Sequence, residues 1–486
     1  MEVELKLALA PEAASRLRHH PMLKGCKPVR RKLLSLYFDT PDFALSRRGV
    51  ALRLRRIGYH WEQTLKAEAE STGALTSRPE WNIQVTGNRP DLDVLPAEAR
   101  ALLTGVDAAD LAPCFSTEFT RTAWHLERAD GALELALDQG EVRVGEASEA
   151  ISEVEFELKA GTDAQLFQVA IGFLEALPFT LEPRSKAERG YLLAGVIRAA
   201  PLRGGKPDLS AGQDAGTAWR TMLASSLSHL IANVPGTLAG LDPEYLHQMR
   251  VAVRRLRTLL QLGRSLSLDE SLWKDDLRWL MGELSPARDW DVFATETWPR
   301  FSQPWAGEAP VRLLFEQVAA RRAQANTRAR AALTSGRFVR LVLEVEAGMA
   351  EVPTLGRSVD EWAAEVLDHR LKQFKRQGRD FARLDASGRH ALRIAAKRLR
   401  YSADAFASLH DKRARVYLST LATLQDALGV ANDLVVAQRL LGEFVGTPHA
   451  YAVGLLEGYM TGASTGRLAS LKRAYAKFVG MKPFWR

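Results

Sequence analysis

Charged and apolar residues alternate with a period of two in five short segments of the first 160 residues. The opening segment puts Glu2, Glu4 and Lys6 on one face of an extended chain and apolar residues on the other. The other segments with this pattern are 51–55, 62–66, 134–138 and 153–159. Stretches that predict covering helices are 11–18, 96–103 and 164–177. The N-terminal part is therefore predicted to be a β-sheet with helices on its apolar face.

The charged faces of these strands carry both signs at high density. In an ordinary half-buried sheet such a face points to bulk water. Five strands of this kind also fit a closed antiparallel barrel with a polar lumen, covered outside by helices. Carboxylates in a lumen suit a hard cation such as Mg²⁺, and Arg and Lys suit phosphate oxygens. We therefore expect a tunnel that binds a metal ion together with a phosphate chain.

Beyond residue 213 the pattern is helical, and one basic stretch occurs twice. One face of the first copy carries four basic residues within about 80° of arc: His247, Arg250, Arg254 and Arg257. The second copy follows 143 positions later with His390, Arg393, Lys397 and Arg400. The opposite side of the first copy is apolar, at Met249, Val253, Leu256, Leu259 and Leu260. Because like charges on one helix face repel, two such faces indicate a shared polyanionic partner.

Composition narrows the class of protein. The formal net charge is +8 and the pI is near 9.4, which favours an anionic partner without identifying it. Cys26 and Cys114 form no CxxC motif, which argues against a disulfide framework or a zinc site. The N-terminus has no apolar leader, and there is no run of about 18 apolar residues. We expect a cytoplasmic protein without a membrane partner.

Domain boundaries follow from the change in pattern. A Pro/Gly/Ser-rich stretch at 200–213 has no periodicity and predicts a linker. It separates a domain at 1–199 from an all-helical domain at 214–486, whose two repeats are expected at about 214–350 and 351–486. Breaks between helices are predicted at the proline and glycine positions 234–236, 285–286, 352–353 and 387–388. The predicted fold class is a multidomain α+β chain.

The N-terminal motifs resemble the CYTH domain of the triphosphate tunnel metalloenzymes. The residues that carry the resemblance are Glu2-x-Glu4-x-Lys6, the segments 37–42, 49–55, 64–66 and 137–138, Glu153-x-Glu155-x-Glu157, and Ser185 to Tyr191. Members of that family include inorganic triphosphatases, thiamine triphosphatases and class IV adenylyl cyclases. The resemblance implies a metal-dependent enzyme that uses Mg²⁺ or Mn²⁺.

Roles are carried over by position. The resemblance implies metal ligands at Glu2, Glu4, Glu153, Glu155 and Glu157. It implies substrate-binding cations at Arg53, Arg55, Lys66, Arg121 and Lys186. The implied catalytic set is Glu2, Glu4, Lys6, Lys66 and Asp138, the last at the end of its predicted strand.

The duplicated basic helices resemble the CHAD domain, an all-helical family that binds inorganic polyphosphate. The two copies differ from each other where Arg288 corresponds to Asn432 and Thr258 to Tyr401. The resemblance implies that the eight basic residues of the two faces bind polyphosphate. A CYTH domain joined to a CHAD domain is a bacterial arrangement that implies inorganic triphosphatase activity, in the cytoplasm and in association with polyphosphate granules.

Alternative functions stay open at this point. The chain could be a polyphosphate-binding protein without turnover, or an enzyme acting on thiamine triphosphate or on ATP as an adenylyl cyclase. Nucleic-acid binding is disfavoured because aromatic residues are sparse on the basic faces, Tyr401 being the main exception. The oligomeric state is not indicated by the sequence.

Overall fold

The structure is a computed structural model that describes residues 2–67, 70–128, 131–269, 271–463 and 468–486. Packing divides the chain into two compact units. The first comprises Met1–Leu202, Leu227–Ala239 and Leu333–Glu351, and the second comprises Arg203–Ser226, Gly240–Ala332 and Val352–Arg486. The predicted domains at 1–199 and 214–486 remain a prediction, because the first unit takes two helical segments from the second range.

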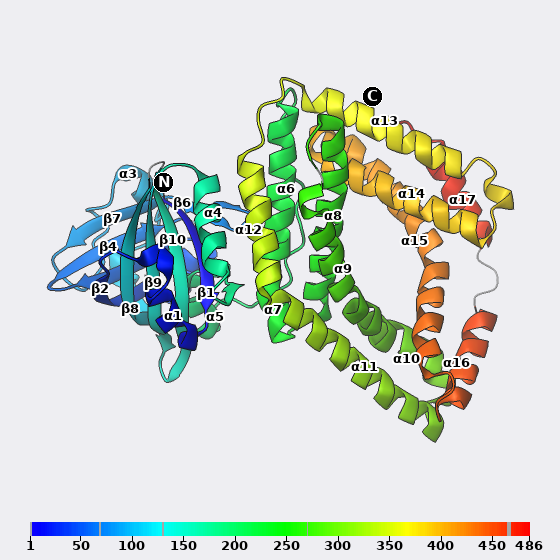
Figure 1. Cartoon of the computed structure of the whole chain (residues 1–486), viewed down its shortest axis with the longest axis horizontal. Coiled ribbons are helices and arrows are strands. Elements are labelled where there is room, and N and C mark those ends of the chain that lie inside the picture. Colours follow the sequence, from blue (N-terminus) through cyan, green and yellow to red (C-terminus); the bar gives the residue numbers. More distant parts are fainter. Residues whose placement is uncertain (1, 68–69, 129–130, 270, 464–467) are drawn as a thin grey trace. The chain divides into compact units, whose positions relative to one another are not determined.

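The first unit is built on one antiparallel sheet, drawn in blue and teal in Figure 1. Its strands, taken from the described residues, are β1 Glu2–Leu9, β2 Val29–Asp39, β3 Ala51–Ile57, β4 His60–Lys66, β5 Glu70–Thr72, β6 Leu75–Arg78, β7 Glu80–Val85, β8 Ala112–Arg128, β9 Gly131–Val144, β10 Ala147–Ala160 and β11 Phe179–Leu181. Their order is β5-β6-β1-β10-β9-β8-β2-β3-β4-β7, and β11 also pairs with β1. All five segments predicted as strands are confirmed.

A single proline joins two strands that lie far apart in the strand order of this sheet. Strand β6 pairs with β1 and strand β7 pairs with β4, and only Pro79 separates them. Proline has no N–H to give to a ladder, so the strand bends here and changes partners. The bend brings the first and last parts of the sheet together around a lumen. The predicted tunnel architecture is confirmed.

Three helices fall in the stretches predicted to cover the apolar outer face: α1 Ala14–Arg18, α3 Ala97–Ala101 and α4 Asp163–Leu174. Two further helices, α2 Ala44–Arg47 and α5 Lys186–Leu193, border the lumen through Ser46 and Lys186. Leu52, Leu54 and Leu65 are fully buried and pack in one cluster with residues of α3. Phe156 of β10 contacts Phe173 of α4 with ring centroids 5.8 Å apart. Burial of these side chains orients the alternate, charged residues of the same strands into the lumen.

Two helical segments from later in the chain complete the first unit. Helix α7, Val234–Ala239, and helix α12, Gly336–Ala350, belong to it together with the last part of α6, Ala215–Ala232. Helix α12 packs against α4 and β11. Its buried side chains include Val342, Leu343 and Val345, each at most 1% exposed. The sheet is thus supported by a helix that the sequence pattern assigned to another domain.

The second unit is helical. Its remaining helices are α8 Pro243–Gly263, α9 Ser271–Val292, α10 Trp298–Ser302, α11 Ala309–Leu333, α13 Val359–Gln377, α14 Ala386–Ala405, α15 Asp411–Leu441, α16 Ala450–Ala463 and α17 Leu468–Val479. The two basic helices α8 and α14 contact each other. The apolar back of α8 is buried as predicted, with Met249 and Val253 fully inaccessible. Among the described residues, no helix combines the length and the hydropathy needed to cross a bilayer.

Four local expectations were wrong. The predicted break at 234–236 falls inside α7, which begins at Val234. Helix α9 runs through Pro286, because buried Leu284 and Ala287 anchor it on both sides of the proline. The predicted break at 387–388 falls inside α14, which begins at Ala386 with Asp385 as its N-cap. Strand β9 continues six residues past Asp138, to Val144.

The segment predicted as a linker forms no helix or strand between residues 200 and 210. It nevertheless makes specific hydrogen bonds. The Leu202 amide donates to Asn233 Oδ1 at 3.1 Å, within the first unit, and the Gly212 amide donates to Asp360 Oδ2 at 2.7 Å, within the second. Both ends of the segment are therefore fixed to the unit in which they lie.

Candidate functional sites

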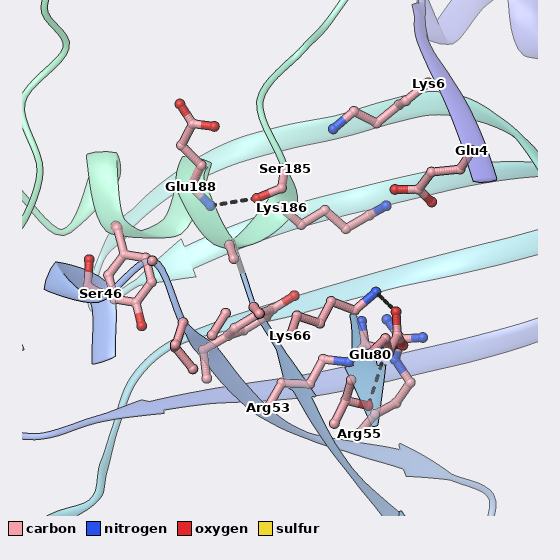
Figure 2. Close-up of a pocket in the computed structure, with 18 of the residues that line it drawn as sticks. Glu4, Lys6, Ser46, Arg53, Arg55, Lys66, Glu80, Ser185, Lys186 and Glu188 are labelled. Carbon is pink, nitrogen blue, oxygen red and sulfur yellow. Dashed lines mark hydrogen bonds and ion pairs between the residues drawn. The ribbon is translucent and has the colours of Figure 1, made fainter. Parts of the chain in front are cut away.

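The lumen of the sheet contains a cavity of about 620 Å³ lined by charged side chains. Its lining includes the five cations predicted to bind substrate together with Lys6 of the predicted catalytic set: Lys6, Arg53, Arg55, Lys66, Arg121 and Lys186. It also includes six glutamates: Glu4, Glu62, Glu80, Glu153, Glu155 and Glu188. Figure 2 shows Glu4 and Lys6 leaving strand β1 on the same side. Nine of these twelve charged residues are among the site residues predicted from the sequence, namely the six cations and Glu4, Glu153 and Glu155.

Strands β3, β4 and β7 form one wall of the cavity. In their register Arg53 lies opposite Thr64, and Lys66 lies opposite Glu80. The Lys66 ammonium is ion-paired with the Glu80 carboxylate, as Figure 2 shows, and Arg53 Nη2 lies 3.7 Å from the same carboxylate. Arg53 is only 9% exposed, and its Nε is buried without a hydrogen-bond partner. A buried donor of this kind is costly unless a ligand supplies an acceptor.

Arg55 adds to the positive charge of this wall. Its Nε donates to Ser35 Oγ at 3.0 Å. Burial, and then the neighbouring charge of Arg53, lower the pKa of Arg55 to about 10. Two guanidinium groups held close together in a buried place favour an anion between or beside them.

The opposite wall holds a network of buried carboxylates and cations from β8, β9, β10 and α5. Arg121 donates two hydrogen bonds to the Asp138 carboxylate, with N–O distances of 2.8 and 2.7 Å, and it also forms an ion pair with Glu155. Lys186 Nζ lies 2.7 Å from Asp138 Oδ2 and 2.7 Å from Glu155 Oε1, and it pairs with Glu153. Burial opposes charge on Glu155, but Arg121 and Lys186 hold the pKa of its carboxyl well below its usual range.

A divalent metal ion fits the donor set on this wall. Oxygens of Asp138, Glu153 and Glu155 all lie within 4.8 Å of one another. Three carboxylates are the donors that Mg²⁺ and Mn²⁺ prefer. In this structure the Lys186 ammonium forms ion pairs with all three carboxylates. The three carboxylates together therefore already bind one cationic group. Glu4 lines the same cavity from β1 and would be a further ligand.

The depressed pKa of Glu155 leads to a prediction on acid stability. Its folded pKa lies below the unfolded value of 4.5, so its contribution is present above about pH 4.5 and is lost as pH falls through the folded pKa. Replacing Glu155 by Gln should lower the free energy of unfolding at pH 7 by about 3 kcal/mol, because two buried cations lose a partner. Denaturant titrations should show this difference shrinking below pH 4.5.

A matched control for this prediction lies on the outer face of the sheet. Glu118 pairs with Lys32 at 2.6 Å, and both side chains are largely exposed. Glu118→Gln should change the free energy of unfolding by less than about 1 kcal/mol. If the two variants behave alike at neutral pH, the network around Glu155 does not stabilise the fold.

Some predicted residues lie outside the cavity lining. Asp138 is fully buried behind Arg121 and Lys186, so it positions cations and does not border the cavity. Glu157 pairs with Lys159 and is not among the lining residues. The side chain of Glu2 lies outside the described residues.

Several lining residues were missed by the sequence prediction. Glu80 and Asn82 come from β7, where Asn82 Oδ1 accepts from Thr64 Oγ1 at 2.7 Å. Their alternation with Trp81 and Ile83 is a period-two signal that could have identified this strand. Arg189 of α5 does not line the cavity and was quoted only as part of a motif, yet it bonds Glu149 at 2.8 Å and the lining residue Glu153 at 3.3 Å.

A second charged cavity, of about 530 Å³, lies within the helical unit. Its lining combines residues of α8, α14 and α15: His247, Val251, Arg254, Arg255, Arg393, Lys397, Arg400, Tyr401, Asp404, Gln425 and Asp426. Arg254 Nε donates to Tyr401 Oη at 2.7 Å, and Arg400 donates to Gln425 at 2.7 Å. We call this cavity the basic groove. The two basic helix faces therefore meet in one place.

Three of the eight predicted polyphosphate residues do not line the basic groove: Arg250, Arg257 and His390. Arg250 instead pairs with Asp289 of α9 at 3.4 Å. His247 does line it, and burial followed by the charges of Arg288 and Arg254 lower its pKa to about 4. The imidazole is therefore neutral at pH 7. The side chains at 429–434, which include Asn432, lie outside the described ones.

Comparison with known proteins relates both halves of the chain to families. A model of the CYTH domain matches residues 1–191, and a model of the CHAD domain matches residues 221–442. A curated inorganic triphosphatase of Haemophilus influenzae is 36% identical over 200 residues, which are 40% of this chain and 54% of that protein. An uncharacterized protein of Mycobacterium tuberculosis is 30% identical over 230 residues, 43% of each chain. The chain thus spans about half the length of the curated relatives it matches.

A solved structure extends the comparison of the helical part. The crystal structure of the CHAD domain from the plant Ricinus communis is 35% identical, with a TM-score of 0.54. The match covers 58% of this chain and 98% of that chain. The chain therefore belongs to the CHAD-domain family and carries a CYTH domain in its N-terminal part.

Proposed function

We propose that this protein hydrolyses inorganic tripolyphosphate in the tunnel of its sheet, using Mg²⁺ or Mn²⁺, and binds long-chain inorganic polyphosphate in the basic groove. One observation carries the first part: a single cavity combines six cations with six carboxylates. Cations alone would suit any anion. The mixture suits a phosphate chain bound together with a divalent ion. The related triphosphatase of Haemophilus influenzae supports this choice of substrate.

The two walls of the tunnel bind different groups: one binds the phosphate oxygens, and the other binds the metal ion. Arg53, Arg55 and Lys66 present donors to phosphate oxygens, and the buried Arg53 Nε gains the acceptor that it lacks. Glu4, Glu153 and Glu155 would hold the metal ion, which supplies charge neutralisation and lowers the pKa of a bound water. Lys186 and Arg121 hold the pKa of the Glu155 carboxyl well below its usual range and orient this group. Binding of the anion in a lumen away from bulk water strengthens each of these interactions.

Phosphate release from tripolyphosphate by the purified full-length chain, with Mg²⁺ or Mn²⁺, tests the enzymatic proposal. ATP and thiamine triphosphate should be offered in parallel. Preferred turnover of an organic triphosphate, or formation of cyclic AMP from ATP, would replace the proposed substrate. If no substrate is turned over with either metal, the chain is a polyphosphate-binding protein without enzymatic activity. Chelation of the metal should abolish release.

The cationic wall gives a prediction for substrate binding. Arg55→Ala should lower kcat/KM for tripolyphosphate roughly tenfold to a hundredfold, since a charge-assisted hydrogen bond contributes about 1.5–3 kcal/mol. It should leave the melting temperature nearly unchanged, because the removed charge repels Arg53. Steady-state kinetics and thermal melts would separate the two effects.

The neighbouring arginine supplies the control. Arg56 points to the other face of β3, is exposed, and donates to the Gly58 carbonyl at 3.2 Å. Arg56→Ala should retain kcat/KM within twofold. A loss of stability without a kinetic change in the Arg55 variant would make Arg55 a structural residue.

The remaining proposals concern the whole protein. The boundaries 1–199, 200–213 and 214–486, with two helical repeats, are proposed from the sequence motifs. Location in the cytoplasm with polyphosphate granules is proposed from the expected ligand of the basic groove. Fluorescence microscopy of the tagged chain, with polyphosphate stained, checks the location.

A further inference from the structure

The short hairpin of strands β5 and β6 lies directly beside the strand that carries Glu4. Strand β6 pairs antiparallel with β1, and in this register Thr76 is the partner of Glu4. On its other side β1 pairs with β10, where Glu157 is the partner of Glu4. The backbone at Glu4 is thus fixed by two neighbours. One of them, β6, belongs to a hairpin whose outer strand β5 ends the sheet.

The turn of this hairpin is held by two helices of the same compact unit. The Gly73 amide donates to Ser228 Oγ of α6 at 2.8 Å. The Ala74 amide donates to the carboxyl group of Glu346 on α12. Both helical segments belong to the unit that contains the sheet. Since β5 has β6 as its partner in the described sheet, these contacts fix the end of the hairpin farthest from Pro79.

Glu346 and Gly73 are matched to each other. Glu346 is 3% exposed in a helix where Val342 and Val345 are also buried, and burial raises the pKa of its carboxyl to about 8. Gly73 has a φ of +70°, and a Cβ added to it would lie 1.7 Å from Glu346 Oε1. A glycine is therefore required for the carboxyl group to approach the turn. A carboxyl buried among valines is costly unless it makes such a contact.

We propose that Glu346 is a positioning residue for the tunnel, which acts by holding the turn at Gly73 and Ala74 so that β6 fixes β1 and directs Glu4 into the cavity. This inference rests on the proposed triphosphatase activity of the tunnel. It assigns a role in that reaction to Glu346, which lies 342 positions (346 − 4) after Glu4 in the sequence. Glu346 does not touch the cavity, because it is not among its lining residues.

Kinetics of three variants of the full-length chain test the proposal. Glu346→Ala should raise the half-saturating Mn²⁺ concentration about tenfold, the size of effect seen when an outer support of a metal ligand is lost. The KM for tripolyphosphate at saturating Mn²⁺ should stay within twofold, since the cationic wall is untouched. Glu346→Gln keeps the acceptor for Ala74 and should behave like the unchanged protein. Gly73→Ala should reproduce the Glu346→Ala defect from the other side of the contact.

The control is Val345→Ala, which removes buried volume from the same helix without removing the hydrogen bond. Hydrogen–deuterium exchange supplies a readout that does not need activity. Glu346→Ala should speed exchange in peptides covering residues 2–7 and 73–78, whereas Val345→Ala should not do so selectively.

Each outcome has one meaning. Faster exchange with unchanged Mn²⁺ dependence in an active enzyme overturns the positioning role, and so does an equal defect in the Val345 variant. If the unchanged protein does not hydrolyse tripolyphosphate, the proposed function fails, and exchange alone then decides whether Glu346 holds β6 against β1. Equal exchange in all variants rejects that linkage.

Discussion

Replacing Glu4 by glutamine should lower the turnover of tripolyphosphate by about a hundredfold to a thousandfold, the loss typical of removing one group that stabilises charge in the transition state. Glu4 lines the tunnel from β1, on the face shared with Lys6. The amide keeps the volume of the side chain but loses the charge that would hold a divalent ion. Initial rates measured over a range of Mg²⁺ and Mn²⁺ concentrations check the loss, and added metal should restore only part of it.

A suitable control for this variant lies on the outer face of the same sheet. Glu141 of β9 pairs with Arg143 and is the register partner of the exposed Glu118. Glu141→Gln should keep full activity and an unchanged melting temperature. Unchanged hydrolysis by the Glu4 variant at limiting metal would remove Glu4 from the metal site. The carboxylate ligands would then be Glu153 and Glu155, which line the cavity from the opposite wall.

The sequence predicted the strands of the tunnel well because their signal is local. Alternation within β1, β3 and β10 specifies which side chains face the lumen, without any knowledge of the neighbouring strand. Closure at Pro79 depends on β6 and β7 choosing different partners, and partner choice is a long-range property that no periodicity contains. The period-two signal of β7 could have shown that Glu80 lies on a strand, but not that this strand pairs with β4 and lines the tunnel.

The helical part shows the same limit. The spacing of apolar residues specifies which face of a helix is buried, so the prediction of the buried face of α8 was correct. Which basic residues of that face meet a common cavity depends on where the neighbouring helices lie. Arg250 forms an ion pair with Asp289 of α9, whereas Arg254 of α8 donates a hydrogen bond to Tyr401 of α14. The offset between the copies revealed the duplication, but only packing shows that both copies line one basic groove.

Reversing the charge of the basic groove should abolish binding of long-chain polyphosphate by the full-length chain. The variant carries glutamate at Arg254, Arg393, Lys397 and Arg400, all of which line the groove. Four lost phosphate contacts and four new repulsions should weaken binding at least a thousandfold at 150 mM salt. By analogy with nucleic acids, affinity of the unchanged chain should fall on the order of a hundredfold between 50 and 200 mM salt, because each contact releases a counterion. Fluorescence anisotropy with labelled polyphosphate measures both effects.

The effect of the overall charge on binding must be separated from the effect of the basic groove, because the chain has a net charge of +8. A control with glutamate at Lys375, Arg376, Lys412 and Arg413 changes the net charge equally at exposed positions outside the groove. It should reduce affinity by less than tenfold and keep the salt slope. Tripolyphosphate hydrolysis should be nearly unchanged in both variants, since the tunnel is lined by other residues. An equal loss of polyphosphate affinity in both variants would mean that binding depends on the overall charge and not on the groove. If single-stranded nucleic acid of equal charge binds more tightly than polyphosphate, the groove binds another polyanion.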